Sequence, residues 1–321
     1  MRQLIAALLL LSALCPPAGA YRYDDSLGTK LLGEFRAAVT SRRTGRDFYA
    51  RLDARPESAG LRILLRRAPA ERVAWYDLEE NAVYFNTRHV QEFFDIKGYR
   101  DSRIIEILNV GKAARGEFVK RADALFLHEL VHALQSYLYP RYRAGAADGN
   151  PVEFEHEAYF TEDLYFHEKL GDSQELLADF LAGKEQDVYT GHSLAGYIEL
   201  SLDADRYREY IRARYLRDEA LGYTDLEAAG RRARARAADG RIAAYATGDA
   251  SGYEAEKAAA AAAAAEKAAY DAFLEDFYAS RWPAFSAEAL LLLGSAGLEA
   301  GNYKLALDCL AQAEEKLPPG E

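Results

Sequence analysis

Residues 121–139 read RADALFLHELVHALQSYLY and form the most apolar helix that the sequence predicts, ending before Pro140. Apolar side chains recur with helical period in two neighbouring stripes, so the helix is apolar around most of its circumference and is expected at the centre of the fold. The first stripe is Leu127, Val131, Leu134 and Leu138, and the second is Phe126, Leu130, Ala133 and Tyr137. Ionisable side chains inside such a helix cost free energy unless a partner satisfies them.

The ionisable side chains in this helix form the motif HExxH, with His128, Glu129 and His132. Positions i and i+4 lie one turn apart on one helix face, so both imidazoles can reach one tetrahedral Zn²⁺ ion. Glu129 is then placed to take a proton from a water molecule at the metal. The alternative is a pair of core histidines that hydrogen-bond to the backbone.

The residues that follow His132 separate the classes of HExxH protein. A metzincin would continue as HExxHxxGxxH, but residues 133–135 are Ala-Leu-Gln, with no Gly or third His at that spacing. Instead, residues 153–159 read EFEHEAY on the next predicted helix, residues 152–170. This arrangement, over about residues 60–170, resembles the gluzincin zinc metallopeptidases, in which a glutamate from a following helix completes the zinc site.

The resemblance implies a third zinc ligand in this second helix. Many gluzincins carry the pattern Glu-x-x-Ala, and Glu155 with Ala158 fits it, so Glu155 is our candidate ligand. Glu157 and His156 stay open as alternatives. Glu162 lies two turns beyond Glu155, where it could hydrogen-bond a ligating histidine, although we expect a surface charge there.

The resemblance also implies a mechanism of peptide-bond hydrolysis. Zinc would lower the pKa of a water molecule, and Glu129 would accept its proton and pass it to the leaving amine. Gluzincins usually add a downstream Tyr or His that stabilises the oxyanion. In residues 188–197, VYTGHSLAGY, our first candidate for that role is His192, and Tyr189 and Tyr197 are the alternatives.

Strand-like segments occur only upstream of the HExxH helix. Residues 24–55 have a helical pattern, residues 61–65 and 73–77 read as strands, and residues 82–86 form a β-hairpin with the second of these. By resemblance, Ala82–Asn86 is the candidate edge strand that holds an extended substrate, with a plain structural hairpin as the alternative. The predicted fold class is α+β, predominantly helical, with a small antiparallel sheet packed beside the zincin-like active-site helix and an α-helical C-terminal unit.

That C-terminal unit is expected over residues 201–321, after a metallopeptidase domain at 21–200. Residues 258–265 are eight consecutive alanines, which predict a long solvent-exposed helix. Residues 287–318 resemble one tetratricopeptide repeat, a helix–turn–helix in which Gly294 and Ala306 allow close packing and Tyr303 packs across the turn. The repeat packs on the upstream helices or presents a face to a protein partner.

Composition and the N-terminus indicate where the protein acts. Residues 1–20 combine Arg2, a short apolar run and the small-residue site Ala-Gly-Ala, which predicts a signal peptide, an exported protein and no membrane span after cleavage. The net charge of −11 argues against a nucleic-acid partner. Two cysteines, at 15 and 309, exclude a disulfide scaffold and a thiolate zinc site.

Together these observations predict an exported zinc-dependent metallopeptidase that acts on a peptide or protein substrate. The metal would be Zn²⁺, held by His128, His132 and Glu155. A second hypothesis is an exported helical scaffold or interaction protein whose zinc site is structural or catalytically silent. An open fourth zinc position facing Glu129 would favour the enzyme. Residues 21–60 could also act as a pro-segment or lid that blocks the cleft.

Overall fold

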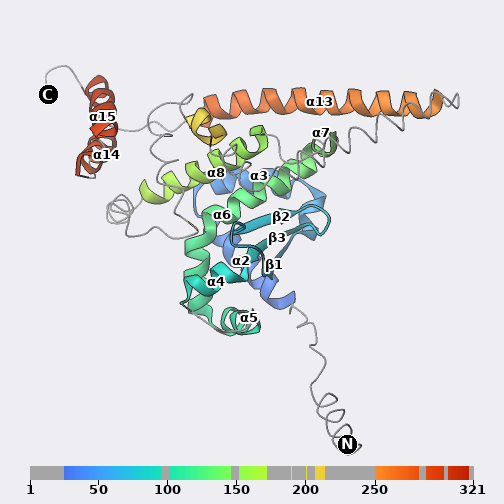
Figure 1. Ribbon diagram of the computed structural model, residues 1–321, viewed down its shortest axis with the longest axis horizontal. Helices are drawn as coiled ribbons and strands as arrows, with labels where there is room; N and C mark the ends of the chain where they lie inside the picture. The colour runs from blue at the N-terminus through green and yellow to red at the C-terminus, as the bar shows by residue number, and fades with distance from the viewer. Residues whose placement is uncertain are drawn as a thin grey trace, which may run out of the picture.

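The computed structural model describes residues 25–95, 101–145, 152–171, 189, 200, 207–213, 250–281, 287–299 and 303–317. Over these residues the chain is mostly helical with one three-stranded sheet, which confirms the α+β, predominantly helical prediction (Figure 1). None of the helices in the described part is long and apolar enough to cross a membrane. The predicted signal peptide lies outside the described residues, so export stays a prediction.

In the N-terminal part, two helices and a 3₁₀ turn precede three consecutive strands, after which the described chain is helical. The elements are α2 (Asp25–Val39), α3 (Arg43–Asp53), the 3₁₀ turn η1 (Pro56–Gly60), β1 (Arg62–Arg66), β2 (Ala74–Asp77), β3 (Ala82–Asn86), α4 (Thr87–Phe93), α5 (Asp101–Val110), α6 (Lys112–Leu138), α7 (Pro140–Gly145) and α8 (Val152–Gly171). The C-terminal part adds α13 (Ala250–Arg281), α14 (Ala287–Glu299) and α15 (Tyr303–Lys316). The predicted helices, strands and hairpin of residues 24–170 are therefore present, and the HExxH helix begins earlier than residue 121.

The sheet is mixed, with strand order β1-β3-β2, so the prediction of an antiparallel sheet is wrong. The predicted hairpin is present, because β2 pairs antiparallel with β3, with Tyr76 opposite Val83. However, β1 pairs parallel with β3, which places β3 in the centre. All five residues of β3 are buried, whereas β1 and β2 are partly exposed. An uninterrupted apolar strand is suited to the central position, and β2 is therefore the edge strand beside α6.

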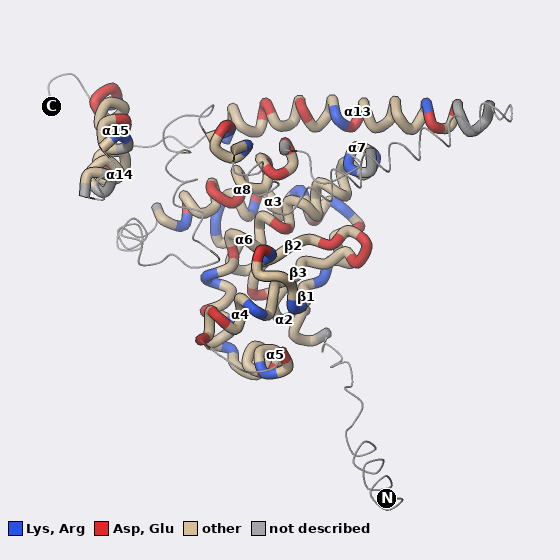
Figure 2. The backbone as a smooth tube through the Cα atoms, viewed as in Figure 1, with Lys and Arg blue, Asp and Glu red and all other residues tan. Residues whose placement is uncertain are grey.

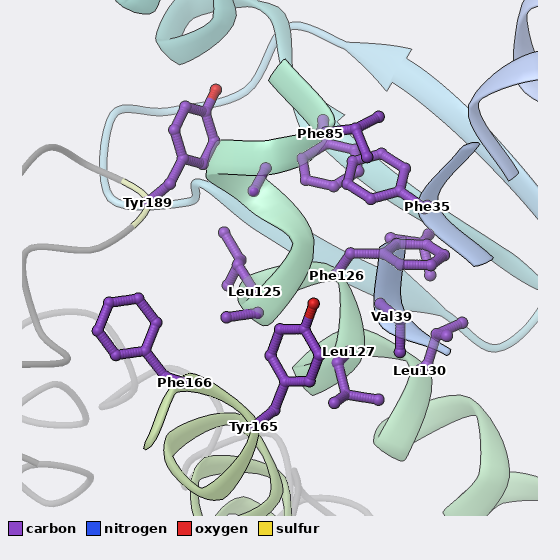
Figure 3. Close-up of a cluster of buried hydrophobic side chains, with 14 of the residues drawn as sticks. Phe35, Val39, Phe85, Leu125, Phe126, Leu127, Leu130, Tyr165, Phe166 and Tyr189 are labelled. Carbon is purple, nitrogen blue, oxygen red and sulfur yellow. The ribbon is translucent and has the colours of Figure 1, made fainter. Parts of the chain in front are cut away.

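The main core lies where α2, the sheet and α6 meet (Figure 3). Phe35 of α2 stacks on Phe85 of β3 at a ring-centroid distance of 5.4 Å and on Phe126 of α6 at 4.5 Å. All three side chains are fully buried. Residues 21–60 therefore include a helix that the core requires, which argues against a removable pro-segment that contains α2.

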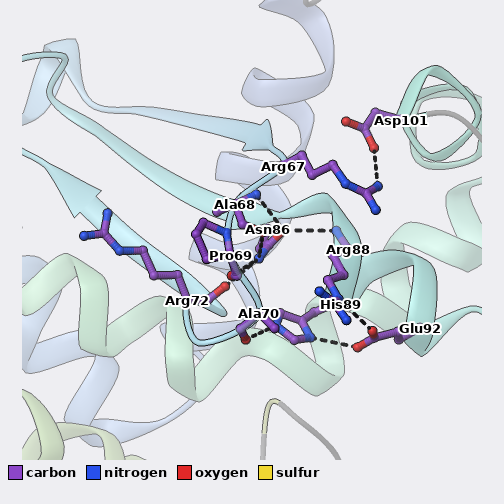
Figure 4. Close-up of polar contacts among 10 residues, drawn as sticks. All are labelled: Arg67, Ala68, Pro69, Ala70, Arg72, Asn86, Arg88, His89, Glu92 and Asp101. Carbon is purple, nitrogen blue, oxygen red and sulfur yellow. Dashed lines mark hydrogen bonds and ion pairs between the residues drawn. The ribbon is translucent and has the colours of Figure 1, made fainter. Parts of the chain in front are cut away.

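A cluster of polar contacts fixes residues 67–73, which connect β1 to the edge strand β2 (Figure 4). The Asn86 amide, which is fully buried, donates to the carbonyl oxygens of Ala68, Pro69 and Arg72 at 2.7–3.1 Å. His89 adds a contact of 2.8 Å to the carbonyl oxygen of Ala70. These bonds give carbonyl groups of the loop a fully buried donor and hold the start of β2 in place.

Asn86→Ala is expected to lower the free energy of unfolding by about 3 kcal/mol, because it removes a fully buried side chain whose amide bonds to three carbonyl groups of the loop. Chemical denaturation monitored by circular dichroism measures the change. Asn109→Ala is the matched control, since Asn109 is half-buried and contacts Lys30. We expect the control to lose less than about 1 kcal/mol. Equal losses in the two variants would show that the loop does not depend on Asn86.

A second core joins α8 to α13. The Tyr270 ring of α13 lies 4.8 Å from that of Phe154 in α8, and Glu266 of α13 accepts hydrogen bonds from the backbone of Arg141 and Tyr142 in α7. The eight alanines lie upstream in α13, where exposed residues predominate, as predicted, and charged residues flank them (Figure 2). The helix thus attaches to α7 and α8 through its C-terminal half.

Helices α14 and α15 pack on each other as the predicted helix pair, and the predicted turn at Gly301 and Asn302 lies outside the described residues. A Cβ atom at Gly294 would lie 3.3 Å from Cβ of Cys309 and 3.4 Å from the carbonyl oxygen of Ala306, so the small residues do allow close packing. Tyr303 is 67% exposed, so the prediction that it packs across the turn is wrong. The partners of a tyrosine at the first position of a helix are not determined by helical period. Membership of the tetratricopeptide class stays a prediction.

Candidate metal centre

The two histidines of the motif lie side by side on α6. Both are about 5% exposed, and their Nε2 atoms are 3.2 Å apart. The i, i+4 spacing on a straight helix produces this arrangement, with ring centroids 4.9 Å apart. Within the described residues, neither Nε2 atom hydrogen-bonds to the helix backbone. Because the two Nε2 atoms lie so close together, both face the same point.

Glu155 of α8 meets the two histidines at that point. Its Oε2 lies 3.6 Å from Nε2 of His128, and its Oε1 lies 3.6 Å from Nε2 of His132. Ligand atoms of all three residues lie within 4.8 Å of one another. Ala158, one turn beyond Glu155, is fully buried where α8 packs on α6, consistent with a small residue that allows close approach.

The donor set fits a zinc ion. Zinc–nitrogen distances of 2.0–2.1 Å in a tetrahedron place two nitrogen ligands about 3.3 Å apart, close to the observed spacing of the imidazoles. Glu162 and Gln135 accept hydrogen bonds from Nδ1 of His128 and His132, at 3.0 and 2.9 Å. When neutral, both histidines therefore present a lone pair at Nε2, and the two lone pairs face one position that a cation can occupy.

The two residues that accept hydrogen bonds from Nδ1 of the histidines lie on different helices, Glu162 on α8 and Gln135 on α6. Glu162 is fully buried beside His128, so the expectation of a surface charge is wrong. Gln135 also donates from Nε2 to the carbonyl oxygen of Phe154 and to Oε2 of Glu157, both at 2.9 Å. The Gln135 side chain therefore connects His132 on α6 to the start of α8. Its two bonds to α8 hold it in the position from which it orients His132.

The two alternative ligands point elsewhere. Glu157 is buried, but its Oε2 accepts from Gln135 and from Tyr270 of α13, and its Oε1 lies 3.6 Å from Arg51 of α3. His156 packs on the other side of α8, where its Nδ1 contacts the hydroxyl of Tyr278, and burial lowers its pKa to about 3. Neither belongs to the group of ligand atoms around the two histidines.

Glu129 lies beside this group without being part of it. It is 6% exposed, and burial raises the pKa of its carboxyl group, an effect that His128 and His132 partly offset. The backbone N–H of Tyr76 on the edge strand β2 lies close enough to the carboxylate to act to lower the same pKa.

Charge is strongly coupled among the three ligand candidates. Burial acts to lower the pKa of His128, but hydrogen bonds to Glu155 and Glu162 outweigh it and raise that pKa well above the usual value. Burial acts to raise the pKa of Glu155, but the charges and hydrogen bonds of the two imidazoles, His132 first, hold it well below the usual value.

Of the candidates for oxyanion stabilisation, Tyr189 alone lies in the described part of the chain. His192 and Tyr197 lie outside the described residues. Tyr189 is buried against Phe118 and Phe93, with centroid distances of 5.7 and 6.0 Å (Figure 3). Phe118 precedes His128 by ten residues of α6, or about 15 Å along the helix axis. Tyr189 is therefore part of the core, and its candidacy is wrong.

Sequence reasoning missed one cation near the centre. Arg143 of α7 donates from Nη1 to the carbonyl oxygen of His132 at 2.8 Å. Burial, the largest effect, lowers the pKa of its guanidinium, while Tyr76, Glu155 and Glu129 act to raise it. Its position eleven residues beyond the motif, across a helix break, carries no periodic signal. Sequence reasoning also missed Tyr270 of α13, because it is more than 100 residues from the motif in sequence.

Comparison with known proteins does not assign a function to this site. No family model, curated protein or solved structure matches the chain. The resemblance to gluzincins therefore rests on the HExxH motif and the glutamate helix, and it stays a prediction.

The geometry predicts different effects on metal binding for the substitution of Glu155 and the substitution of Glu157. Glu155→Gln is expected to lower the zinc affinity at least tenfold, because it replaces a charged ligand with a neutral one. Glu157→Gln is the matched control, and we expect one zinc per chain to be retained. Elemental mass spectrometry after dialysis measures the metal content, with His128→Ala as the variant that loses it. Loss in Glu157→Gln and retention in Glu155→Gln would contradict the assignment.

Proposed function

We propose that the protein is a zinc metallopeptidase. The observation that carries the proposal is the convergence of His128, His132 and Glu155 with a fourth ionisable group, Glu129, directly beside them. Within the described residues, three side chains offer ligand atoms at this point. Structural zinc sites have four protein ligands, whereas catalytic sites have three and leave a position for water or substrate.

Each residue has a separate task in this proposal. His128, His132 and Glu155 hold the ion, which supplies a Lewis acid that polarises a carbonyl group and acidifies water. Glu129 accepts a proton from the attacking water at its carboxylate and donates it to the amide nitrogen that leaves. A buried carboxyl group with a raised pKa is suited to hold and then release that proton.

The edge strand supports a peptide as the substrate. The predicted role of Ala82–Asn86 as an edge strand is wrong, because β3 pairs on both sides. That role passes to β2, which is unpaired on the side away from β3 within the described sheet and whose Tyr76 N–H acts on the pKa of Glu129. An extended peptide that pairs with β2 would lie alongside the acid.

Glu129→Gln tests the proposed chemistry. Removing the proton acceptor is expected to lower peptidase activity at least 100-fold while one zinc per chain is retained. Activity is measured with the zinc-loaded full chain on a degenerate library of internally quenched peptides. Glu117→Gln, an exposed change on the same helix, is the control and keeps full activity.

Two results would contradict the proposal. One is a wild-type protein that binds zinc and cleaves no peptide in the library, which would favour the scaffold with a silent site. The other is cleavage that survives Glu129→Gln with its rate unchanged.

A further inference from the structure

Arg143 lies beside the proposed centre, where its guanidinium bonds to the backbone of His132. Helix α6 ends before Tyr139, and the next helix, α7, places the Arg143 side chain against the carbonyl oxygen of His132. Its Cζ also lies 5.8 Å from the ring centroid of Phe154, the residue before Glu155. The guanidinium is thus fixed between the metal helix α6 and the start of α8.

This cation lacks the acidic partner that nearby arginines have. Arg141 on the same helix pairs with Glu266, and Arg51 pairs with Glu157. Within the described residues, no carboxylate lies within 4 Å of the Arg143 guanidinium, although Glu129 and Glu155 are close enough to act on it electrostatically. A largely buried cation of this kind is suited to an anion that arrives from outside.

The unused donors of Arg143 form a fork. Nη1 is engaged with His132, and Nε and Nη2 make no hydrogen bond with a described residue. Neither atom is among the buried polar atoms that lack a partner, so both remain open to solvent. Nε and Nη2 share one edge of the planar guanidinium, which is the edge that receives the two oxygens of a carboxylate.

We propose that Arg143 binds a carboxylate of the peptide substrate, which rests on the proposed peptidase function. The carboxylate is either the free C-terminus of the peptide or an acidic side chain. In both cases a bidentate contact holds the peptide beside Glu129 and the three ligands. Arg143 would then determine which peptides bind, whereas Glu129 and the metal would carry out the reaction.

Binding without turnover tests this proposal separately from the peptidase function. The zinc-loaded full chain carrying Glu129→Gln is dialysed to equilibrium against three libraries of N-acetylated tripeptides, and retention is read by mass spectrometry. The first library has free C-termini and no Asp or Glu, the second has the same residues with amidated C-termini, and the third is amidated and contains Asp and Glu. Arg143→Gln, Arg143→Lys and the control Arg141→Gln are compared in this background.

We expect the first or the third library to be retained about tenfold or more above the second, which identifies the source of the carboxylate. Arg143→Gln abolishes the preference, Arg143→Lys retains the charge but loses most of it, and Arg141→Gln keeps it. Equal retention of the three libraries, no retention, or a preference that survives in Arg143→Gln at full zinc content would overturn the proposal. Carboxylate retention without peptidase activity in the wild type would uphold Arg143 and reject the peptidase.

Discussion

The structure depends on how α6 and α8 satisfy polar groups that they bury together. Two imidazoles and the carboxylates of Glu129 and Glu162 are at most 6% exposed where α6 packs on α8. An isolated charge in such a place costs many kcal/mol. The arrangement is stable because each imidazole has an outer acceptor at Nδ1 and an inner anion near Nε2. The same constraint that stabilises the helix pair creates a site for a cation.

Distant elements support this arrangement from outside. Gln135 bonds to His132, to the first turn of α8 and, at 3.3 Å, to the hydroxyl of Tyr270 on α13. The backbone of the edge strand β2 lies close enough to Glu129 to act on the pKa of its carboxyl group. Residues from three parts of the chain therefore hold the inner groups in place, and preorganised outer partners of this kind tune both ligand geometry and basicity.

The sequence predicted those parts of the site that local pattern determines. HExxH on an apolar helix and Glu155 with Ala158 on the next helix are short-range signals, and so is the hairpin of β2 and β3. Strand order was not predictable, because parallel pairing of β1 depends on which strand the core covers. Arg143 and Tyr270 were missed since each reaches the centre across a helix break or a long loop. Glu162 was misjudged because its burial depends on how α8 packs.

The central claim is that two imidazoles and one carboxylate hold a metal that keeps an open position. X-ray absorption at the zinc edge of the loaded wild-type protein tests it most directly. The account predicts a first shell of nitrogen and oxygen only, at about 2.0–2.2 Å, with outer scattering from two imidazole rings. A sulfur shell at about 2.3 Å, or scattering from no imidazole, would contradict it.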